Sequence, residues 1–272
     1  MSCKQPIFDD AELERAFQRD GYVTVPLLDA AELSELAESW RTISDPVQQQ
    51  AFSATMFSTD AAYRRRTSRA ICERIVPHVH RLMPNVRLVI GSFVTKLPGD
   101  GGYLGMHQDP SFVDDAYYTS ANVWFPLVDL TESNGALWVV PGSHVLDPEP
   151  RAFLARFPHQ EFESVLRGQY ARPLYVPAGT AVIAHHGLYH FSPPNHSGAI
   201  RIACAALVVS ADAPLRFFHE VRGEGRIDVY AVGDDFYCSY VIGTAPDAVH
   251  VDTIPLRANP LELQKLKGAP PR

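Results

Sequence analysis

Residues 86–97, Val-Arg-Leu-Val-Ile-Gly-Ser-Phe-Val-Thr-Lys-Leu, mark the change from a helical to a β pattern that decides the fold. The stretch is rich in β-branched and apolar residues, which favour an extended strand. It ends at Pro98-Gly99-Asp100-Gly101-Gly102, which predicts a turn or loop. Further short strands are expected over residues 121–127, 137–140, 174–176, 181–185 and 201–210. Short strands at this spacing predict a double-sheet jelly roll.

The residues before this stretch follow a mostly helical pattern. Gly21 is placed to end a first helix, and Asp29 is placed to cap a second. Residues 42–65 are polar and allow no assignment. The apolar spacing predicts a strand over residues 22–26 and helices over residues 11–17, 30–40, 68–83 and 153–167.

The chain has 272 residues, enough to bury a large core. We expect one mainly β domain with flanking helices. Its parts would be a helical N-terminal region of about residues 9–83, a jelly-roll core of about residues 86–210 and a C-terminal extension of residues 211–272.

The composition excludes several classes of protein. Hydrophobic residues make up 46% of the chain and charged residues 20%, which is typical of a soluble globular protein. A net charge of −7 argues against nucleic acid or an anionic membrane as the main partner. No apolar run approaches the roughly 20 residues that cross a bilayer, and residues 1–10 lack a secretory signal. We therefore expect a cytoplasmic monomer or homodimer that binds a small molecule.

His107-Gln108-Asp109 is the first candidate for a metal site. A histidine and a carboxylate two residues apart point to the same side of a strand. With a second histidine they form a 2-His-1-carboxylate triad, which binds Fe(II) and leaves positions open for other ligands. One such motif can arise by chance in a chain with 11 histidines, so it needs support from the rest of the sequence.

The second histidine has several candidates, because His185, His186, His190 and His196 lie close together in the sequence. His190 is favoured, with His186 as the alternative. The reason is a set of polar residues at fixed offsets after His190, namely Ser192, Asn195, Ser197 and Arg201.

Four stretches together resemble the phytanoyl-CoA dioxygenase family of Fe(II)- and 2-oxoglutarate-dependent oxygenases. The first is residues 17–23, Phe-Gln-Arg-Asp-Gly-Tyr-Val, and the second is the His-Gln-Asp motif at 107–109. The third is residues 134–144, Asn-Gly-Ala-Leu-Trp-Val-Val-Pro-Gly-Ser-His, and the fourth is residues 190–201, with the pattern H-x-S-x-x-N-x-S-x-x-x-R. The resemblance covers residues from about 10 to 210 and implies a double-stranded β-helix, that is, a cupin-like jelly roll.

The resemblance also implies roles for the matching residues. The proposed iron ligands are His107, Asp109 and His190. Arg201 would pair with the distal carboxylate of 2-oxoglutarate, a task that suits a guanidinium, and Ser192 would hydrogen-bond the same end.

Two further residues are linked to the cosubstrate by the resemblance alone. Trp124 lies where relatives place a residue that lines the 2-oxoglutarate pocket. Lys96 resembles a lysine that often contacts the cosubstrate, and a solvated lysine at a strand end is the alternative. Asn134-Gly135, Pro141-Gly142 and His144 are better explained by turn structure than by catalysis.

The implied enzyme uses Fe(II), 2-oxoglutarate and O2 to oxidise a C–H bond of a small-molecule metabolite, releasing succinate and CO2. Halogenating relatives replace the ligand carboxylate by a small residue, so Asp109 favours hydroxylation or another oxidation. Two alternatives remain: a metal enzyme of the same triad that does not use 2-oxoglutarate, and a non-catalytic small-molecule binding protein.

The substrate is expected to meet an aromatic wall on the open side of the iron, formed by Tyr103, Phe191 and residues 110–118 and 236–240. Such a wall suits a small, partly apolar molecule, with an amine as an option if Asp114 and Asp115 face it. A solvated loop is the alternative for these two carboxylates. No basic patch for a CoA phosphate is evident, which favours a specialised or amino-acid-like metabolite over phytanoyl-CoA.

Overall fold

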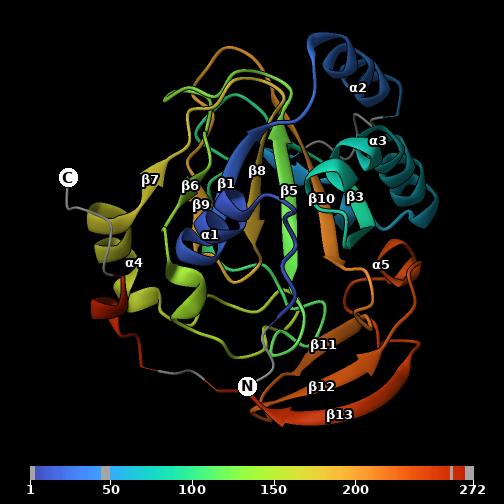
Figure 1. The fold of residues 1–272 in the computed structure, drawn as a ribbon, viewed down its shortest axis with the longest axis vertical. Helices are drawn as coiled ribbons and strands as arrows, with labels where there is room; N and C mark the ends of the chain where they lie inside the picture. Colours follow the sequence, from blue (N-terminus) through green and yellow to red (C-terminus); the bar gives the residue numbers. More distant parts are fainter. Residues whose placement is uncertain (1–3, 44–49, 258–259, 267–272) are drawn as a thin grey trace.

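The computed structural model describes residues 4–43, 50–257 and 260–266 and is built mainly of antiparallel β-sheet (Figure 1). The largest sheet has six strands, in the order β1 (Tyr22–Pro26), β8 (Thr180–His185), β5 (Ser120–Pro126), β10 (Arg201–Ser210), β3 (Val86–Lys96) and β2 (Phe52–Ala54). A second sheet has four strands, in the order β4 (Leu104–His107), β9 (His190–Ser192), β6 (Trp138–Val139) and β7 (Arg172–Pro173). Residues from both sheets line one cavity, so the two sheets face each other as an open jelly roll.

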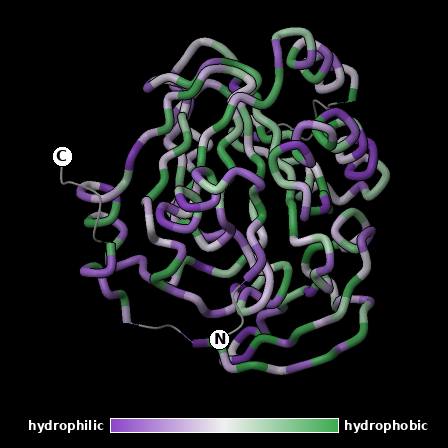
Figure 2. The backbone as a smooth tube through the Cα atoms, in the orientation of Figure 1, coloured by the Kyte–Doolittle hydropathy of each residue, from purple (hydrophilic) through white to green (hydrophobic). Residues whose placement is uncertain are grey.

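Three helices, α1 (Ala11–Asp20), α2 (Ala30–Ile43) and α3 (Ala61–Leu82), cover the outer face of the six-stranded sheet (Figure 1). Alternation along the strands decides which side chains meet them. Val123 and Phe125 of β5 point outward into the core beneath the helices, whereas Asn122 and Trp124 point into the jelly roll. Figure 2 shows hydrophobic segments along the central strands and hydrophilic ones on the helices and outer loops.

Capping residues in the sequence set where helices α1 and α2 begin and where α1 ends. The Asp10 carboxylate accepts hydrogen bonds from two backbone N–H groups at the start of α1, and Gly21 ends that helix at a φ of 79°. The Asp29 carboxylate accepts from the N–H groups of Ala31 and Glu32, both at 2.9 Å, at the start of α2. Both predicted caps are confirmed.

The predicted strands agree with the structure except at residues 174–176. The strand there, β7, covers Arg172–Pro173 instead, although the Leu174 N–H still donates to the Leu137 carbonyl. The helix predicted over residues 153–167 is reduced to turns at η4 (Gln160–Phe162), α4 (Glu163–Val165) and the π-helix η5 (Leu166–Tyr170). Helix α3 begins at Ala61 rather than at residue 68, because Asp60 caps it.

The unassigned stretch 42–65 contains β2 and the 3-10 turn η2 (Thr55–Phe57), while residues 44–49 lie outside the described residues. Two further 3-10 turns are η3 (Ser143–Val145) and η6 (Leu263–Lys265). In the described part of the chain, no helix has both the length and the apolar character needed to cross a membrane.

The C-terminal residues add a third sheet of β11 (Arg216–Val221), β12 (Arg226–Ala231) and β13 (Val249–Pro255). Together with α5 (Phe236–Ser239) it closes one end of the jelly roll, at the bottom of Figure 1. Phe217 and Tyr237 pack there with Ile90 of β3 and Leu207 of β10 in one apolar cluster.

Candidate active site

The end of β4 and the start of β9 bring the predicted metal ligands together. His107 and His190 are directly opposed in the β4–β9 register, and their ring centroids are 4.1 Å apart. Asp109 Oδ1 lies 3.9 Å from His190 Nε2. One ligand atom from each of the three residues can be chosen so that all lie within 4.8 Å of one another. This grouping contains His190 and not His186.

Backbone carbonyls fix the imidazole tautomers. His107 Nδ1 is 2.7 Å from the Gly105 carbonyl oxygen, and His190 Nδ1 is 2.9 Å from the Leu188 carbonyl oxygen. Because a carbonyl only accepts, each Nδ1 carries the proton and each Nε2 keeps a free lone pair. Nε2 is therefore the available ligand atom, and its partner nitrogen is held as in known metal sites.

The electrostatics keep the Asp109 carboxylate ionised. Burial acts to raise the pKa of Asp109, but the imidazoles of His190, His186 and His107 outweigh it and hold that pKa below its ordinary value. Asn122 Nδ2 adds a long hydrogen bond of 3.4 Å to Asp109 Oδ2. Burial, with His190 nearby, lowers the pKa of His107 to about 4. A neutral imidazole beside an ionised carboxylate fits a divalent cation.

His186 lies beside the triad rather than in it. Its side chain is buried, with the ring centroid 4.8 Å from that of Phe112, and burial lowers its pKa to about 4. Its Nδ1 has no hydrogen-bond partner among the described residues. The other two histidines are elsewhere, since His185 packs against His144 and His196 is exposed beside Asp100.

A cavity of about 380 Å³ joins the triad to Arg201, Ser192 and Trp124. Arg201 is 2% exposed, and Nη1 donates to the Gly135 carbonyl at 3.2 Å. Its Nε has no partner, and within the described residues no carboxylate lies within ion-pair distance of the guanidinium. Burial lowers the pKa of Arg201 to about 10, so it stays charged at neutral pH. A buried cation without a counter-ion calls for an anionic ligand.

Trp124 and Lys96 differ in their relation to this cavity. The Trp124 ring centroid is 5.5 Å from the Arg201 guanidinium and forms part of the cavity wall. Lys96 is fully buried behind the wall, and its Nζ donates to the carbonyls of Ser192 at 2.9 Å and Pro193 at 2.5 Å. Burial, with Arg201 nearby, lowers the pKa of Lys96 to about 7. The alternative that Lys96 is solvated at a strand end is wrong. Direct contact between Lys96 and the cosubstrate stays a prediction.

The predicted aromatic wall is largely wrong. Tyr103 and Phe191 line a separate open groove, because Phe191 lies on the opposite face of β9 from His190 and Ser192. Phe236, Tyr237, Cys238 and Tyr240 pack in the core behind the wall, with Tyr237 against Phe112. The part of the prediction that lines the cavity is Pro110 and Phe112.

The two loop carboxylates do not face the cavity. Asp115 is not solvated, since it is buried in an ion pair with Arg151 at 2.9 Å and accepts from Ser111. Arg151 Nε also donates to the Asp109 carbonyl at 2.8 Å, so the ion pair helps to fix the backbone of the candidate metal motif at Asp109. Asn122 and Arg151 were not identified from the sequence, because each reaches Asp109 from a distant segment.

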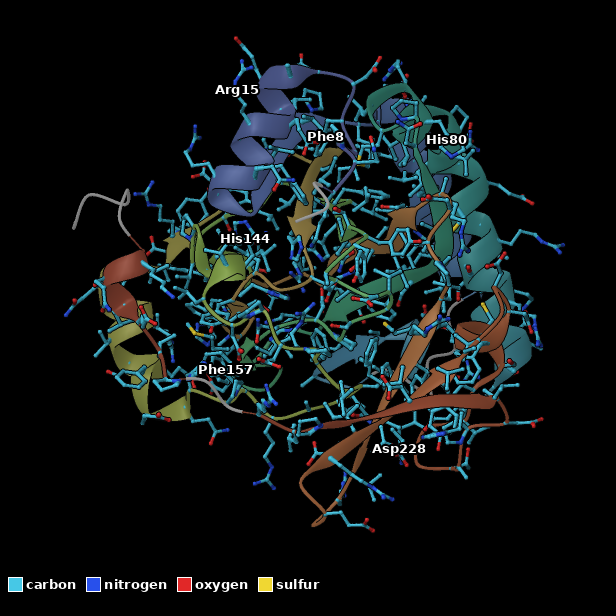
Figure 3. The ribbon with its side chains drawn as sticks, turned by 60° about the horizontal axis from the view of Figure 1, so that its bottom comes forward. Phe8, Arg15, His80, His144, Phe157 and Asp228 are labelled. Carbon is cyan, nitrogen blue, oxygen red and sulfur yellow. The ribbon has the colours of Figure 1, made fainter. Side chains whose placement is uncertain are left out.

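In the motif of residues 134–144, Gly135, Gly142 and His144 have structural roles. Gly135 and Gly142 have φ angles of 72° and 79°, as the turn interpretation requires. His144 lies on the turn beneath α1 in Figure 3, with Nε2 3.2 Å from the Gln18 carbonyl oxygen. None of these three residues lines the cavity.

Comparison with known proteins agrees with this site. The family model for phytanoyl-CoA dioxygenase (PhyH) matches residues 17–203. A rice protein (Oryza sativa subsp. japonica), phytanoyl-CoA dioxygenase 1, is 32% identical over 124 residues, which cover 44% of this chain and 43% of the rice protein. The chain thus spans less than half the length of this curated relative.

Solved structures share the fold. EctD from S. alaskensis, determined with 2-oxoglutarate and 5-hydroxyectoine and also with Fe, is 19% identical, with a TM-score of 0.56 over 82% of this chain and 87% of EctD. The epimerase SnoN, in complex with Fe3+, alpha ketoglutarate and nogalamycin RO, is 21% identical, with a TM-score of 0.52 over 91% of this chain and 95% of SnoN. Because the family model covers well over half of the sequence, the chain belongs to the phytanoyl-CoA dioxygenase family.

Proposed function

We propose that this protein is a non-haem iron oxygenase that uses Fe(II), 2-oxoglutarate and O2 to oxidise a C–H bond of a small molecule. His107 Nε2, His190 Nε2 and an oxygen of Asp109 would hold the metal. Fe(II), once loaded with 2-oxoglutarate and O2, supplies an oxidant strong enough to attack a C–H bond. The family membership and the solved neighbours that contain iron and 2-oxoglutarate support this proposal.

The main support for the proposal is the environment of Arg201. Its charge is buried, lacks a described counter-ion and lines the same cavity as the triad. 2-Oxoglutarate has one carboxylate to pair with Arg201 and a 2-oxo acid end to reach the metal. In a metal enzyme that did not use such an anion, the desolvation free energy of this buried guanidinium would not be offset by an ion pair.

We propose hydroxylation as the reaction. Asp109 occupies the ligand position that halogenating relatives leave free for chloride, so the product should gain oxygen or lose hydrogen but should not gain chlorine. Apolar side chains make up most of the cavity wall around the site. The outcome is checked by mass spectrometry of products formed with and without chloride.

Anaerobic calorimetry tests the binding part of the proposal. 2-Oxoglutarate should bind once to Fe(II)-loaded protein and much more weakly to metal-free protein. Absence of metal binding would favour a non-catalytic binding protein, and metal binding without 2-oxoglutarate would favour a triad enzyme of another kind.

Metal analysis of variants tests the ligand assignment. His107→Ala, Asp109→Ala and His190→Ala each remove an inner-sphere bond and should lose most of the iron. His186→Phe should keep it. Retention by His190→Ala together with loss by His186→Phe would reverse the assignment of the second histidine.

A further inference from the structure

The cavity extends well beyond the end that Arg201 occupies. Arg201 begins β10 and Leu207 lies six residues later, about 20 Å along the strand, yet both line the cavity. In the sheet register Leu207 is opposite Asn122 of β5 and Ile90 of β3. The Asn122 amide in turn contacts Asp109. A second half of the cavity, around Leu207 and Asn122, therefore lies at the Asp109 side of the triad and away from Arg201, and we expect 2-oxoglutarate held at Arg201 to leave it free.

This second half is apolar and carries no spare charge. Among the described lining residues, the only Asp, Glu, Lys or Arg side chains are Asp109 and Arg201, both used at the metal and cosubstrate end. Its rim exposes two large apolar side chains, Phe57 at 41% and Leu154 at 55%. Leu154 has a φ of 59°, a value that residues other than glycine seldom adopt. Exposed apolar side chains held at a cavity mouth mark a surface for an apolar ligand.

Besides the residues assigned to the metal and the cosubstrate, four polar side chains line the cavity, namely Ser92, Gln108, Asn122 and His186, and of these Asn122 and His186 have a buried polar atom without a hydrogen-bond partner among the described residues. Because Asn122 Nδ2 donates to Asp109, its Oδ1 is an acceptor, and no described residue donates to it. His186 Nδ1 is likewise buried without a partner. Both residues line the cavity: Asn122 of β5 is opposite Ala184, and His186 follows the end of β8, where its N–H donates to the Ser120 carbonyl at 3.4 Å. Unsatisfied buried polar atoms on the wall of one cavity indicate a missing hydrogen-bonding group.

We propose that the substrate is an uncharged, largely apolar molecule with one hydroxyl group beside the metal, which donates to Asn122 Oδ1 or hydrogen-bonds to His186 Nδ1. Its apolar body would lie against Phe112 and Leu154. This inference rests on the proposed function, because it concerns the space left once 2-oxoglutarate is bound. It replaces the expected amine, since no carboxylate is available on the wall to pair with one. A charged group placed there would lose its hydration without gaining a counter-ion.

A matched set of three probes tests the charge preference. 1-Adamantanol, 1-adamantylammonium and adamantane-1-carboxylate share one apolar skeleton and differ in the charge of a single polar group. Calorimetry is performed without O2 on the wild-type protein loaded with Fe(II) and 2-oxoglutarate. The alcohol should bind at least about tenfold more tightly than either ion. Equal or tighter binding of an ion, or no binding of the alcohol at millimolar concentration, would overturn the inference.

Two variants and a control test the residues. His186→Phe keeps the ring shape but removes the hydrogen bond, so the alcohol should bind several-fold more weakly while 2-oxoglutarate affinity stays within twofold. Leu154→Asp, at an exposed position, should shift the preference toward the ammonium probe. His219→Phe, on β11 outside the cavity, should change neither affinity. An unchanged alcohol affinity in His186→Phe would contradict the assigned contact.

The same samples separate this inference from the proposed function. If 2-oxoglutarate does not bind the Fe(II)-loaded wild-type protein, the proposed function fails. If 2-oxoglutarate binds and an ionic probe is preferred, the substrate class alone is wrong.

Discussion

Arg201 is the single residue whose removal has the most distinctive consequence. Arg201→Met removes a buried charge without a counter-ion, so the protein free of 2-oxoglutarate should be as stable as the wild type or more stable. Removing one partner of a desolvated pair costs about 2–5 kcal/mol in binding, which raises the 2-oxoglutarate Kd by one or more decades. Thermal denaturation of Fe(II)-loaded protein with and without 2-oxoglutarate measures both effects. Equal stabilisation of the two proteins by 2-oxoglutarate would contradict the account.

Lys96 gives a pH-dependent prediction. Its pKa of about 7 in the folded protein lies below the ordinary value of 10.5, so above pH 7 the unfolded chain holds more protons than the native one. The stability contributed by Lys96 therefore rises with pH. The difference in unfolding free energy between wild type and Lys96→Met should grow, by up to about 2 kcal/mol, from pH 7 to pH 9. The two carbonyl acceptors favour the charged amine and make this an upper bound.

Urea denaturation of both proteins at the two pH values measures this difference. Comparison with Lys96→Met cancels the titration of other groups. A difference that stays constant or shrinks as pH rises would contradict the lowered pKa of Lys96.

At the residue scale the sequence predicted that His107, Asp109 and His190 gather at one candidate metal site and share a cavity with Arg201. His107 and Asp109 are fixed by their spacing on one strand end, and Arg201 by its offset from His190. Asn122 could not be predicted in this way. It reaches Asp109 only through strand pairing, and an asparagine inside an apolar strand gives no local signal of its partner.

At the scale of elements, the turn at Gly135 connects the motif of residues 134–144 to the cavity. A Cβ at Gly135 would lie 2.8 Å from the Pro193 carbonyl oxygen, and the φ of 72° disfavours any side chain. Its carbonyl accepts the Arg201 hydrogen bond. Gly135→Ala should therefore lower stability by about 2 kcal/mol or more and also weaken 2-oxoglutarate binding.

Gly223→Ala is the matched control for this turn. Gly223 has a similar φ of 81°, but a Cβ there meets nothing within 4 Å. Its substitution should cost only the backbone strain, about 1 kcal/mol, and leave 2-oxoglutarate affinity unchanged. Chemical denaturation and calorimetry of both variants check this, and equal effects would show that the contact with Pro193 is unimportant.

Long strands were easier to predict than short ones. The bounds of β10 agree with the prediction at both ends, because residues 202–209 form an apolar run between Arg201 and Ser210 and the strand is buried along nearly its whole length. The two-residue strand β7 is set by its pairing with β6 rather than by its own sequence, and the prediction placed it two residues too late. The helix expected over residues 153–167 was also wrong at its start because of tertiary structure, since residues 152–155 line the cavity instead.

At the scale of the whole molecule, one buried side chain joins α3 to the segment around α5 in the C-terminal layer. Arg64 of α3 donates to the carbonyls of Cys238 at 2.8 Å, Tyr240 at 2.9 Å and Ser58. Arg64→Met leaves these acceptors without donors and should lower stability by about 3 kcal/mol or more. Hydrogen exchange around α5 should accelerate at the same time.

The neighbouring Arg65 provides the control. It forms an exposed ion pair with Asp235 at 2.6 Å, and Arg65→Met should cost less than about 1 kcal/mol. Similar losses in the two variants would show that the three carbonyl contacts do not hold the layer in place.

The position of this layer could not be predicted from the sequence. Residues 211–272 were expected only as an extension, and nothing local to β11, β12 or β13 indicates that they close the jelly roll. That arrangement depends on contacts of Phe217 and Tyr237 with Ile90 and Leu207, which are far away in the chain. Such long-range packing also removed residues 236–240 from the predicted substrate wall.

The fate of molecular oxygen tests the central claim most directly. The purified protein is incubated with Fe(II), 2-oxoglutarate and oxygen-18 gas, and the succinate formed is examined by mass spectrometry, with metal-free protein and Arg201→Met as controls. The account predicts succinate that carries one oxygen-18 atom, in amounts that fall strongly in both controls. Absence of succinate, or succinate without the label, would contradict it.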